Sequence, residues 1–153
     1  MNELDANERA ALARLNHLRA AAATGAEIDE LEARFASARS AQHRLAVYGT
    51  LAPGEPNHHH LSDLAGEWIA GGTVTGTLES LGWGADMGYP ALRWSASGDE
   101  VAVRLFVCAE LPAHWPRLDE FEGDQYLRML VPVRFADGRI EVANLYAAHP
   151  AAG

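Results

Sequence analysis

The amino-acid composition changes near residue 44, and this change limits most strongly what the chain can fold into. Residues 1–44 are rich in Ala, Leu, Glu and Arg and contain neither Pro nor Trp. The residues that follow are rich in Gly, Pro, Val and aromatic side chains. The first composition is typical of helices, and the second is typical of short strands joined by turns. We therefore expect a helical extension over 1–44 and a separate, mainly β domain over 45–153.

The N-terminal segment has the pattern of two amphipathic helices. Apolar residues recur at helical spacing in two sets, which are Leu4, Ala11, Leu15, Leu18 and Ala22, and then Ile28, Leu31, Phe35 and Ala38. Thr24-Gly25 separates the sets and predicts a helical hairpin over about 3–23 and 26–42. Because each helix has one apolar stripe, the hairpin needs a partner surface. That surface is either the body of the chain or a second subunit, so a homodimer through the hairpin is one of two readings.

The second segment carries the signals of short strands. Strands are expected at 45–48, 73–78, 91–94 and 101–108, followed by a β-hairpin of 131–135 and 140–146. Short helices are expected at about 57–64 and 112–121. Strands outnumber helices without a regular βαβ alternation, which indicates the α+β class with a mainly β body.

Charge and residue usage exclude several classes of function. The chain has 21 acidic and 12 basic residues, a formal charge of −9, which argues against nucleic-acid and anionic-membrane partners. All the basic residues are Arg, so Schiff-base chemistry and lysine-dependent phosphate loops are excluded. The single cysteine, Cys108, excludes an internal disulfide. With neither a signal peptide nor an apolar run of 18 residues, we expect a soluble, cytoplasmic, cofactor-independent domain.

Three adjacent histidines, His58-His59-His60, invite a metal-binding interpretation. Consecutive residues on a helix diverge by about 100°, so three neighbouring imidazoles seldom converge on one ion. A structural or solvated role is therefore favoured, and no metal site is predicted.

Two stretches could carry chemistry. In the first, Tyr48-Gly49-Thr50-Leu51 follows a strand, and Gly49 is expected to allow an unusual φ and a close backbone approach to a ligand. Backbone N–H groups in such a turn can hold an anion, although an ordinary turn is the commoner interpretation. The second stretch places four carboxylates within six residues near a helix end, namely Asp119, Glu120, Glu122 and Asp124.

Like charges and the helix dipole raise a carboxylate pKa at such a helix end, toward the range useful in proton transfer. Asp119 and Glu122 are three residues apart and share a helix face, whereas Glu120 turns away. Taken alone, the second stretch is more typical of a solvated acidic turn than of a catalytic site. Tyr126 is either a hydrogen-bond donor near Glu122 or an ordinary residue at the start of a strand.

The two stretches together resemble the γ-glutamylcyclotransferase-like (AIG2-like) family, and most closely its γ-glutamylamine cyclotransferases. The resemblance rests on Tyr-Gly-Thr-Leu at 48–51, Tyr89-Pro90-Ala91, Leu-Asp-Glu-Phe-Glu-Gly at 118–123 with Tyr126 and Arg128, and the final hairpin. It covers about 45–148 and implies a small mixed β-barrel with short flanking helices.

The resemblance also implies an activity and a set of roles. Members of this family are transferases, or lyases, that cyclise a γ-glutamyl group to 5-oxoproline and release the attached amine or amino acid. Glu122 corresponds to the general acid/base and Tyr48 to Leu51 to the loop that holds the glutamyl end, with no metal or cofactor. The chain departs from the family at Val103, which replaces a Gly, and at Ala52, which replaces a basic residue. The alternative is a non-catalytic module on the same fold that binds a small carboxylate or a protein partner.

Overall fold

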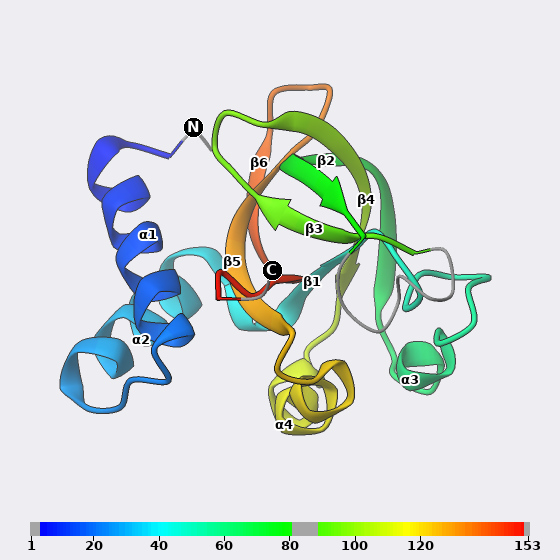
Figure 1. Cartoon of the computed structure of the whole chain (residues 1–153), viewed down its shortest axis with the longest axis horizontal. Coiled ribbons are helices and arrows are strands. Elements are labelled where there is room, and N and C mark those ends of the chain that lie inside the picture. Colours follow the sequence, from blue (N-terminus) through cyan, green and yellow to red (C-terminus); the bar gives the residue numbers. More distant parts are fainter. Residues whose placement is uncertain (1–3, 81–88, 152–153) are drawn as a thin grey trace.

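The computed structural model describes residues 4–80 and 89–151 of the chain. Its helices are α1 (Ala6–Ala20), α2 (Ala26–Arg39), a short 3₁₀-helix η1 (Ala41–His43), α3 (His59–Ser62) and α4 (Leu111–Glu122) (Figure 1). Its strands are β1 (Arg44–Val47), β2 (Glu67–Glu79), β3 (Ala91–Trp94), β4 (Asp99–Val107), β5 (Tyr126–Arg134) and β6 (Ile140–Ala148). The helical hairpin is therefore present where the apolar spacing predicts it, and all the expected strands form.

The strands form a closed barrel with one strand beside it. Their order is β3-β2-β4-β1-β6-β5, and a pairing of β2 with β5 at Thr73 and Arg134 closes five of them into a ring. The pairing of β1 with β6 is parallel and the other pairings are antiparallel. The predicted α+β fold with a small mixed β-barrel is thus confirmed.

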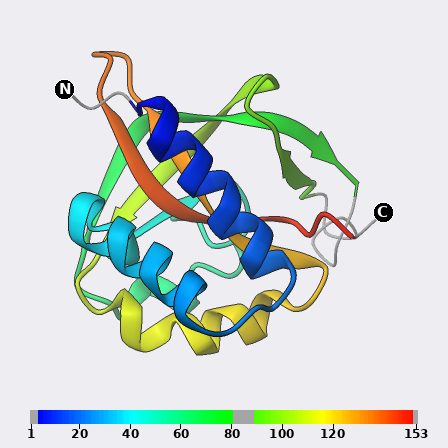
Figure 2. The ribbon, with the colours of Figure 1, turned by 90° about the vertical axis from the view of Figure 1, so that its left-hand side faces the viewer.

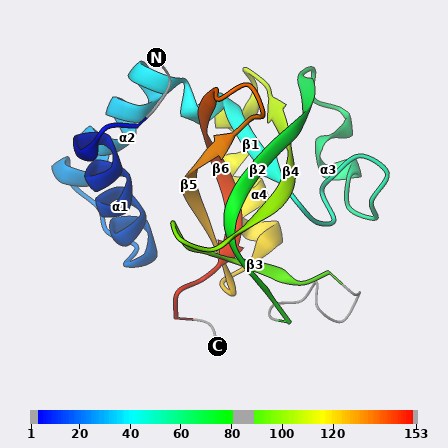
Figure 3. The same ribbon diagram turned by 90° about the horizontal axis from the view of Figure 1, so that it is seen from above.

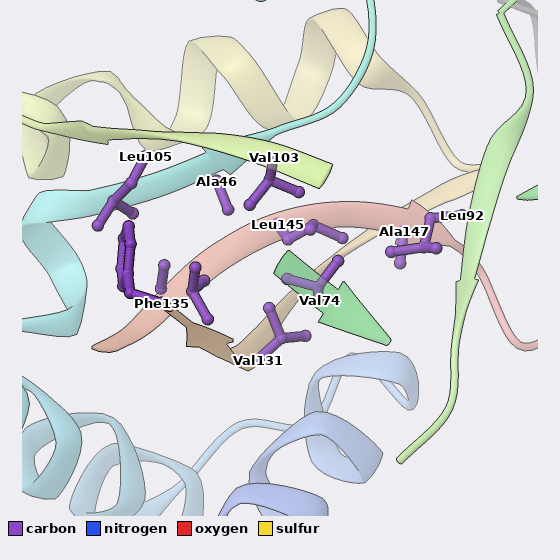
Figure 4. Close-up of a cluster of buried hydrophobic side chains, with 11 residues drawn as sticks. Ala46, Val74, Leu92, Val103, Leu105, Val131, Phe135, Leu145 and Ala147 are labelled. Atoms are coloured by element: carbon purple, nitrogen blue, oxygen red, sulfur yellow. The ribbon is translucent and has the colours of Figure 1, made fainter. Parts of the chain in front are cut away.

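Alternation along the strands directs small and branched side chains into the barrel. The inner face of β6 contributes Ala143, Leu145 and Ala147, which pack against Val103 and Leu105 of β4 (Figure 4). Every residue of β6 from 142 to 148 is buried, because the hairpin and α4 cover its outer face. This double burial explains why β6 has a nearly continuous apolar sequence.

Two strands begin at least five residues earlier than the sequence predicts. The strand expected from residue 73 starts at Glu67, and its register shifts between Ile69 and Gly72. The glycine pair before Thr73 hides the alternation because a β-bulge interrupts it there. β5 starts at Tyr126 rather than at residue 131, because residues 126–130 show no alternation of polar and apolar side chains and the first four of them are only partly buried.

The hairpin packs against the outside of the barrel across β5 and β6 (Figures 2 and 3). Asp5 begins α1 by accepting a 2.8 Å hydrogen bond from the backbone N–H of Glu8. The apolar stripes of both helices reach a shared core with the barrel, made of Leu4, Ala11, Leu12, Leu15, Phe35, Ala41, Leu130 and Val142. The stripes therefore have a partner surface within the same chain, while a homodimer through the hairpin stays a prediction.

A buried asparagine fastens α1 to the barrel. Asn16 Nδ2 donates to the carbonyl of Leu130 at 2.8 Å, and Asn16 Oδ1 accepts from the N–H of the same residue at 2.8 Å. Leu130 lies on β5, on the stretch that does not pair with β2. The side-chain amide therefore completes the hydrogen bonding of a strand edge that would otherwise lack a partner.

Candidate active site

One small pocket, about 40 Å³ in volume, lies where the turn after β1 faces the end of α4 and the start of β5. The sequence-predicted residues come from three separate parts of the chain, and the fold brings all of them to this pocket. Its walls include Tyr48, Gly49, Thr50, Leu51, Glu122 and Tyr126. Tyr89, Pro90 and Tyr146 also line it, together with Ala46 and Val47.

The turn at 48–51 is held by its carbonyl groups. The carbonyl of Gly49 accepts from Ala52 N at 3.1 Å and that of Thr50 from Asn57 N at 2.9 Å. The carbonyl of Leu51 lies 3.0 Å from Nδ1 of His58. Since a carbonyl oxygen only accepts, this His58 nitrogen carries the proton.

The N–H groups of the same turn are left available. Within the described part of the chain, the backbone N–H groups of Gly49, Thr50 and Leu51 have no hydrogen-bond acceptor. A Cβ added to Gly49 would meet no described atom within 4 Å, so this side of the turn is open. The expected unusual φ at Gly49 is wrong, because its backbone is outside the left-handed region. What Gly49 supplies is space, and the three N–H groups suit an anion such as a carboxylate.

Glu122 is the last residue of α4, and Gly123 ends the helix behind it with a φ of 83°. The residue is only 6% exposed, unlike Glu120, which is exposed. Burial raises the pKa of the Glu122 carboxyl to about 8, and the charge of Asp119 contributes further in the same direction. Asp119 therefore acts on Glu122 as their spacing predicts, but the largest cause is burial, which the charge pattern alone does not reveal.

Asp119 is held beside Glu122 by two neighbours. Its Oδ1 accepts a hydrogen bond of 2.6 Å from the Tyr146 hydroxyl and one of 2.8 Å from Nε of Arg128. Burial and this hydrogen bond raise the pKa of Tyr146, so its hydroxyl keeps its proton at neutral pH. The acidic turn is therefore partly built into the fold rather than wholly solvated.

The tyrosines of the pocket have fixed roles in hydrogen bonding. The Tyr48 hydroxyl donates to the carbonyl of Tyr146 at 2.8 Å and accepts from the N–H of Leu92 at 2.8 Å. Burial raises the pKa of Tyr48 as well. Tyr89 donates to Oε2 of Glu55 at 3.0 Å. Tyr48 thus ties the pocket to β3 and β6.

Sequence reasoning did not assign Tyr146, Tyr89 or His58 to the site. Tyr146 reads as an ordinary residue of an alternating strand, and only its proximity to Asp119 in three dimensions marks it out. Tyr89 lies in one of the stretches that carry the family resemblance, so that stretch was the available signal. His58 lies seven residues after Leu51, in the same family-like stretch, but only the structure shows its ring nitrogen beside the carbonyl of Leu51.

Comparison with known families decides which group of proteins this pocket belongs to. The model of the family "Gamma-glutamyl cyclotransferase, AIG2-like" matches residues 45–153. The chain belongs to this family. A search of curated proteins gave no match. In this AIG2-like chain the match begins at β1, so α1 and α2 lie outside it.

Solved structures with the same fold come from distant organisms. YkqA from Bacillus subtilis is 26% identical with a TM-score of 0.53; the alignment covers 72% of this chain but only 37% of YkqA. An AIG2-like protein from Mus musculus is 25% identical with a TM-score of 0.53, covering 69% of this chain and 76% of the mouse chain. A protein from Arabidopsis thaliana at 23% identity, with a TM-score of 0.51 and coverage of 72% and 71%, shares the fold.

The residues at which the chain departs from the family pattern do not line the pocket that contains Glu122. Val103 is buried in the barrel core, and both Val103 and Ala52 line a second groove, which shares Tyr48 and Gly49 with the Glu122 pocket but does not include Glu122. Among residues 4–80 and 89–151, no three His, Cys, Asp or Glu side chains are grouped as metal ligands would be. None of the described helices has the length and apolarity needed to cross a bilayer.

Proposed function

We propose that this AIG2-like protein is an enzyme that cyclises a γ-glutamyl amine or γ-glutamyl amino acid to 5-oxoproline and releases the free amine. The observation that carries the proposal is the placement of a buried carboxyl with a raised pKa, Glu122, in the same pocket as a turn with three available N–H groups. A carboxyl of this kind can exchange protons near neutral pH, and such a turn can hold a carboxylate. Membership of the family supports the same activity.

The turn at 48–51 would hold the α-carboxylate of the glutamyl group. Its N–H groups provide hydrogen bonds to an anion without a cationic side chain, in a protein that contains no Lys. Tyr126, at the start of β5, would border the bound glutamyl chain because it lines the same pocket. A small pocket favours a folded substrate, which places the α-amine near the γ-carbonyl.

The reaction exchanges one C–N bond for another. The α-amine nitrogen attacks the γ-carbonyl carbon and closes a five-membered lactam, and the bond from that carbon to the leaving nitrogen breaks. Glu122 would take the proton that the attacking amine loses and return it to the leaving amine. The overall reaction consumes neither water nor an oxidant. Because both reacting groups belong to one molecule, correct folding of the substrate supplies much of the rate.

The experiment is to incubate the purified chain with a panel of γ-glutamyl amides and γ-glutamyl amino acids and to measure 5-oxoproline. The proposal expects its release with an equal amount of amine, and the panel identifies which leaving group the pocket accepts. Binding of these compounds without any release would contradict catalysis and favour the non-catalytic carboxylate-binding alternative.

A further inference from the structure

We propose that Arg19, on helix α1 outside the family match, is a positioning residue for the candidate active site. Through Asn144 and Arg128 it holds Asp119 in place beside Glu122. This inference rests on the proposed role of Glu122 as the general acid/base. It gives the N-terminal hairpin a part in catalysis in addition to covering the barrel.

The first link is the set of contacts that holds the side chain of Arg19. Its side chain is 10% exposed and makes a two-bond ion pair with Glu32 of α2, at 2.6 and 2.8 Å. The remaining nitrogen, Nη1, donates to the backbone carbonyl of Arg128 at 2.8 Å and to Oδ1 of Asn144 at 3.0 Å. Glu32 thus orients the guanidinium so that it reaches two strands of the barrel.

The second link is Asn144, on the outer face of β6, which is 1% exposed. Its Oδ1 accepts from Arg19 and also from Nη1 of Arg128 at 2.9 Å. Its Nδ2 donates to the carbonyl of Ala41 at 2.9 Å. The amide is therefore fixed from both ends, and its one oxygen joins a guanidinium of the hairpin to a guanidinium of β5.

The third link connects Arg128 to the pocket. Arg128 lies over the ring of Trp115 at 4.5 Å and donates to both oxygens of Asp119, at 2.8 and 3.3 Å. Asp119 in turn holds the hydroxyl of Tyr146, which lines the pocket. The contacts are therefore continuous from α1 to the carboxylate that acts on Glu122.

Docking of the hairpin and orientation of Arg128 use different residues of α1. Asn16 binds the backbone of Leu130 on its own, and the apolar core beneath α1 does not include Arg19. Arg14 offers a matched comparison, because it also pairs through two bonds with an α2 glutamate thirteen residues later, Glu27. That pair is half-exposed at 49% and 56%, and neither side chain has a hydrogen bond or ion pair with the described residues of the barrel.

Loss of Arg19 should change the titration of Glu122 in a defined direction. The ionisable groups around this carboxyl are Asp119 on α4, Arg128 and Tyr126 on β5, Tyr146 on β6 and Tyr48 after β1. With Arg128 less firmly held, the negative charge of Asp119 is less well balanced, which disfavours the ionised form of Glu122. Removal of the Arg19 charge acts in the same direction, so the pKa of Glu122 should rise.

The test uses the full chain labelled with ¹³C at glutamate carboxyls, with Glu122→Gln assigning the Glu122 signal. We expect Arg19→Ala to raise the titration midpoint of Glu122 by about half a pH unit and Arg14→Ala to leave it unchanged. In turnover, Arg19→Ala should lower kcat by about tenfold with little change in KM, because positioning rather than binding is lost. Arg19→Lys, which keeps the charge but not the fork of donors, should lie between Arg19→Ala and the wild type.

The two readouts separate this proposal from the proposed function. A folded Arg19→Ala protein that titrates like the wild type overturns the positioning role, whatever the activity. A raised midpoint in a protein whose wild type releases no 5-oxoproline supports the link to Glu122 and contradicts the cyclotransferase activity. If Arg19→Ala does not fold, Arg19→Lys is read in its place, and a wild-type midpoint in that variant overturns the proposal.

Discussion

The hydroxyl of Tyr146 donates a 2.6 Å hydrogen bond to Oδ1 of Asp119 and thereby fixes a carboxylate one helical turn before Glu122. The two residues come from β6 and α4, so the bond joins the barrel to the helix that carries the proposed acid/base. Asp119 also raises the pKa of Glu122, next in importance to burial. The pair therefore connects the wall of the pocket to the protonation state of the residue on which the proposed chemistry depends.

Replacing Asp119 by Asn should shift activity toward lower pH. Asn keeps the shape and can still accept from Tyr146, but it removes the negative charge that raises the pKa of Glu122. Glu122 must be ionised to accept a proton, so the rising limb of the pH–rate profile should move down from about 8. The measurement is kcat against pH for both proteins. Glu120→Gln is the control, because Glu120 is exposed and is no cause of the shift; a larger displacement in Glu120→Gln than in Asp119→Asn would contradict the assignment.

Glu122 should make the folded protein less stable as pH rises. Between 4.5 and about 8 the native state keeps the Glu122 proton while the unfolded chain gives it up, so the unfolded state is increasingly favoured. The contribution of Glu122 to the unfolding free energy is fully present below pH 4.5 and decreases between pH 4.5 and about 8. Above about pH 8 it no longer changes with pH. Relative to Glu122→Gln, the unfolding free energy should fall by up to about 1.4 kcal/mol per pH unit in this window. The measurement is urea unfolding of both proteins at a series of pH values. If the unfolding free energies of the two proteins changed with pH in parallel, the pKa of Glu122 would not be raised.

Gly49→Val should weaken ligand binding without unfolding the protein. A Cβ at this position meets no described atom within 4 Å and needs no left-handed φ, so we expect the fold to tolerate the substitution. It occupies the open side of the turn, where the glutamyl carboxylate would lie, and we expect at least a roughly tenfold loss of affinity. Calorimetric titration with a γ-glutamyl amide measures this, with thermal unfolding as the check on folding. Thr50→Ser keeps the backbone and the hydroxyl and should bind nearly as the wild type does; equal affinity in all three proteins would place the carboxylate elsewhere.

Asn16→Ala should destabilise the whole chain. The substitution leaves the N–H and the carbonyl of Leu130 without their partner, and each buried unsatisfied group costs about 1–3 kcal/mol. Arg14→Ala is the control on the same helix, since its ion pair is solvent-exposed and its loss should leave the stability nearly unchanged. Denaturant unfolding compares the two variants. If both unfolded at the same denaturant concentration, Asn16 would not be the anchor of the hairpin.

Periodicity in the sequence is sufficient to predict most of the elements. The apolar spacing of α1 and α2 and the alternation along β4 up to Leu105 reflect burial of one face, which is visible in both the sequence and the structure. The start of β2 was missed because a bulge at Gly71-Gly72 breaks the alternation there. Closure of the barrel rests on the single pairing of Thr73 with Arg134, and no local pattern encodes such a long-range contact.

The candidate site was predictable in its chemistry but not in its supports. Glu122 and the turn at 48–51 are contiguous motifs, so resemblance to a family could point to them. Tyr146, the partner of Asp119, lies on another strand, and only the fold brings the two together. His58 is only seven residues from Leu51, but its contact with that carbonyl also depends on the folded turn. The role of Arg19 is not predictable from the sequence for the same reason, since its contacts with Arg128 and Asn144 span more than a hundred residues. The burial of Glu122, which dominates its pKa, likewise requires the three-dimensional structure.

Single-turnover release of 5-oxoproline by wild type and Glu122→Gln tests the central claim most directly. Gln nearly preserves the shape of Glu122 but cannot exchange a proton, while the turn at 48–51 is untouched. We therefore expect Glu122→Gln to lose about 10²–10⁴-fold in rate, with its affinity for the γ-glutamyl compound, measured separately, almost unchanged. Full single-turnover activity in folded Glu122→Gln would contradict the account.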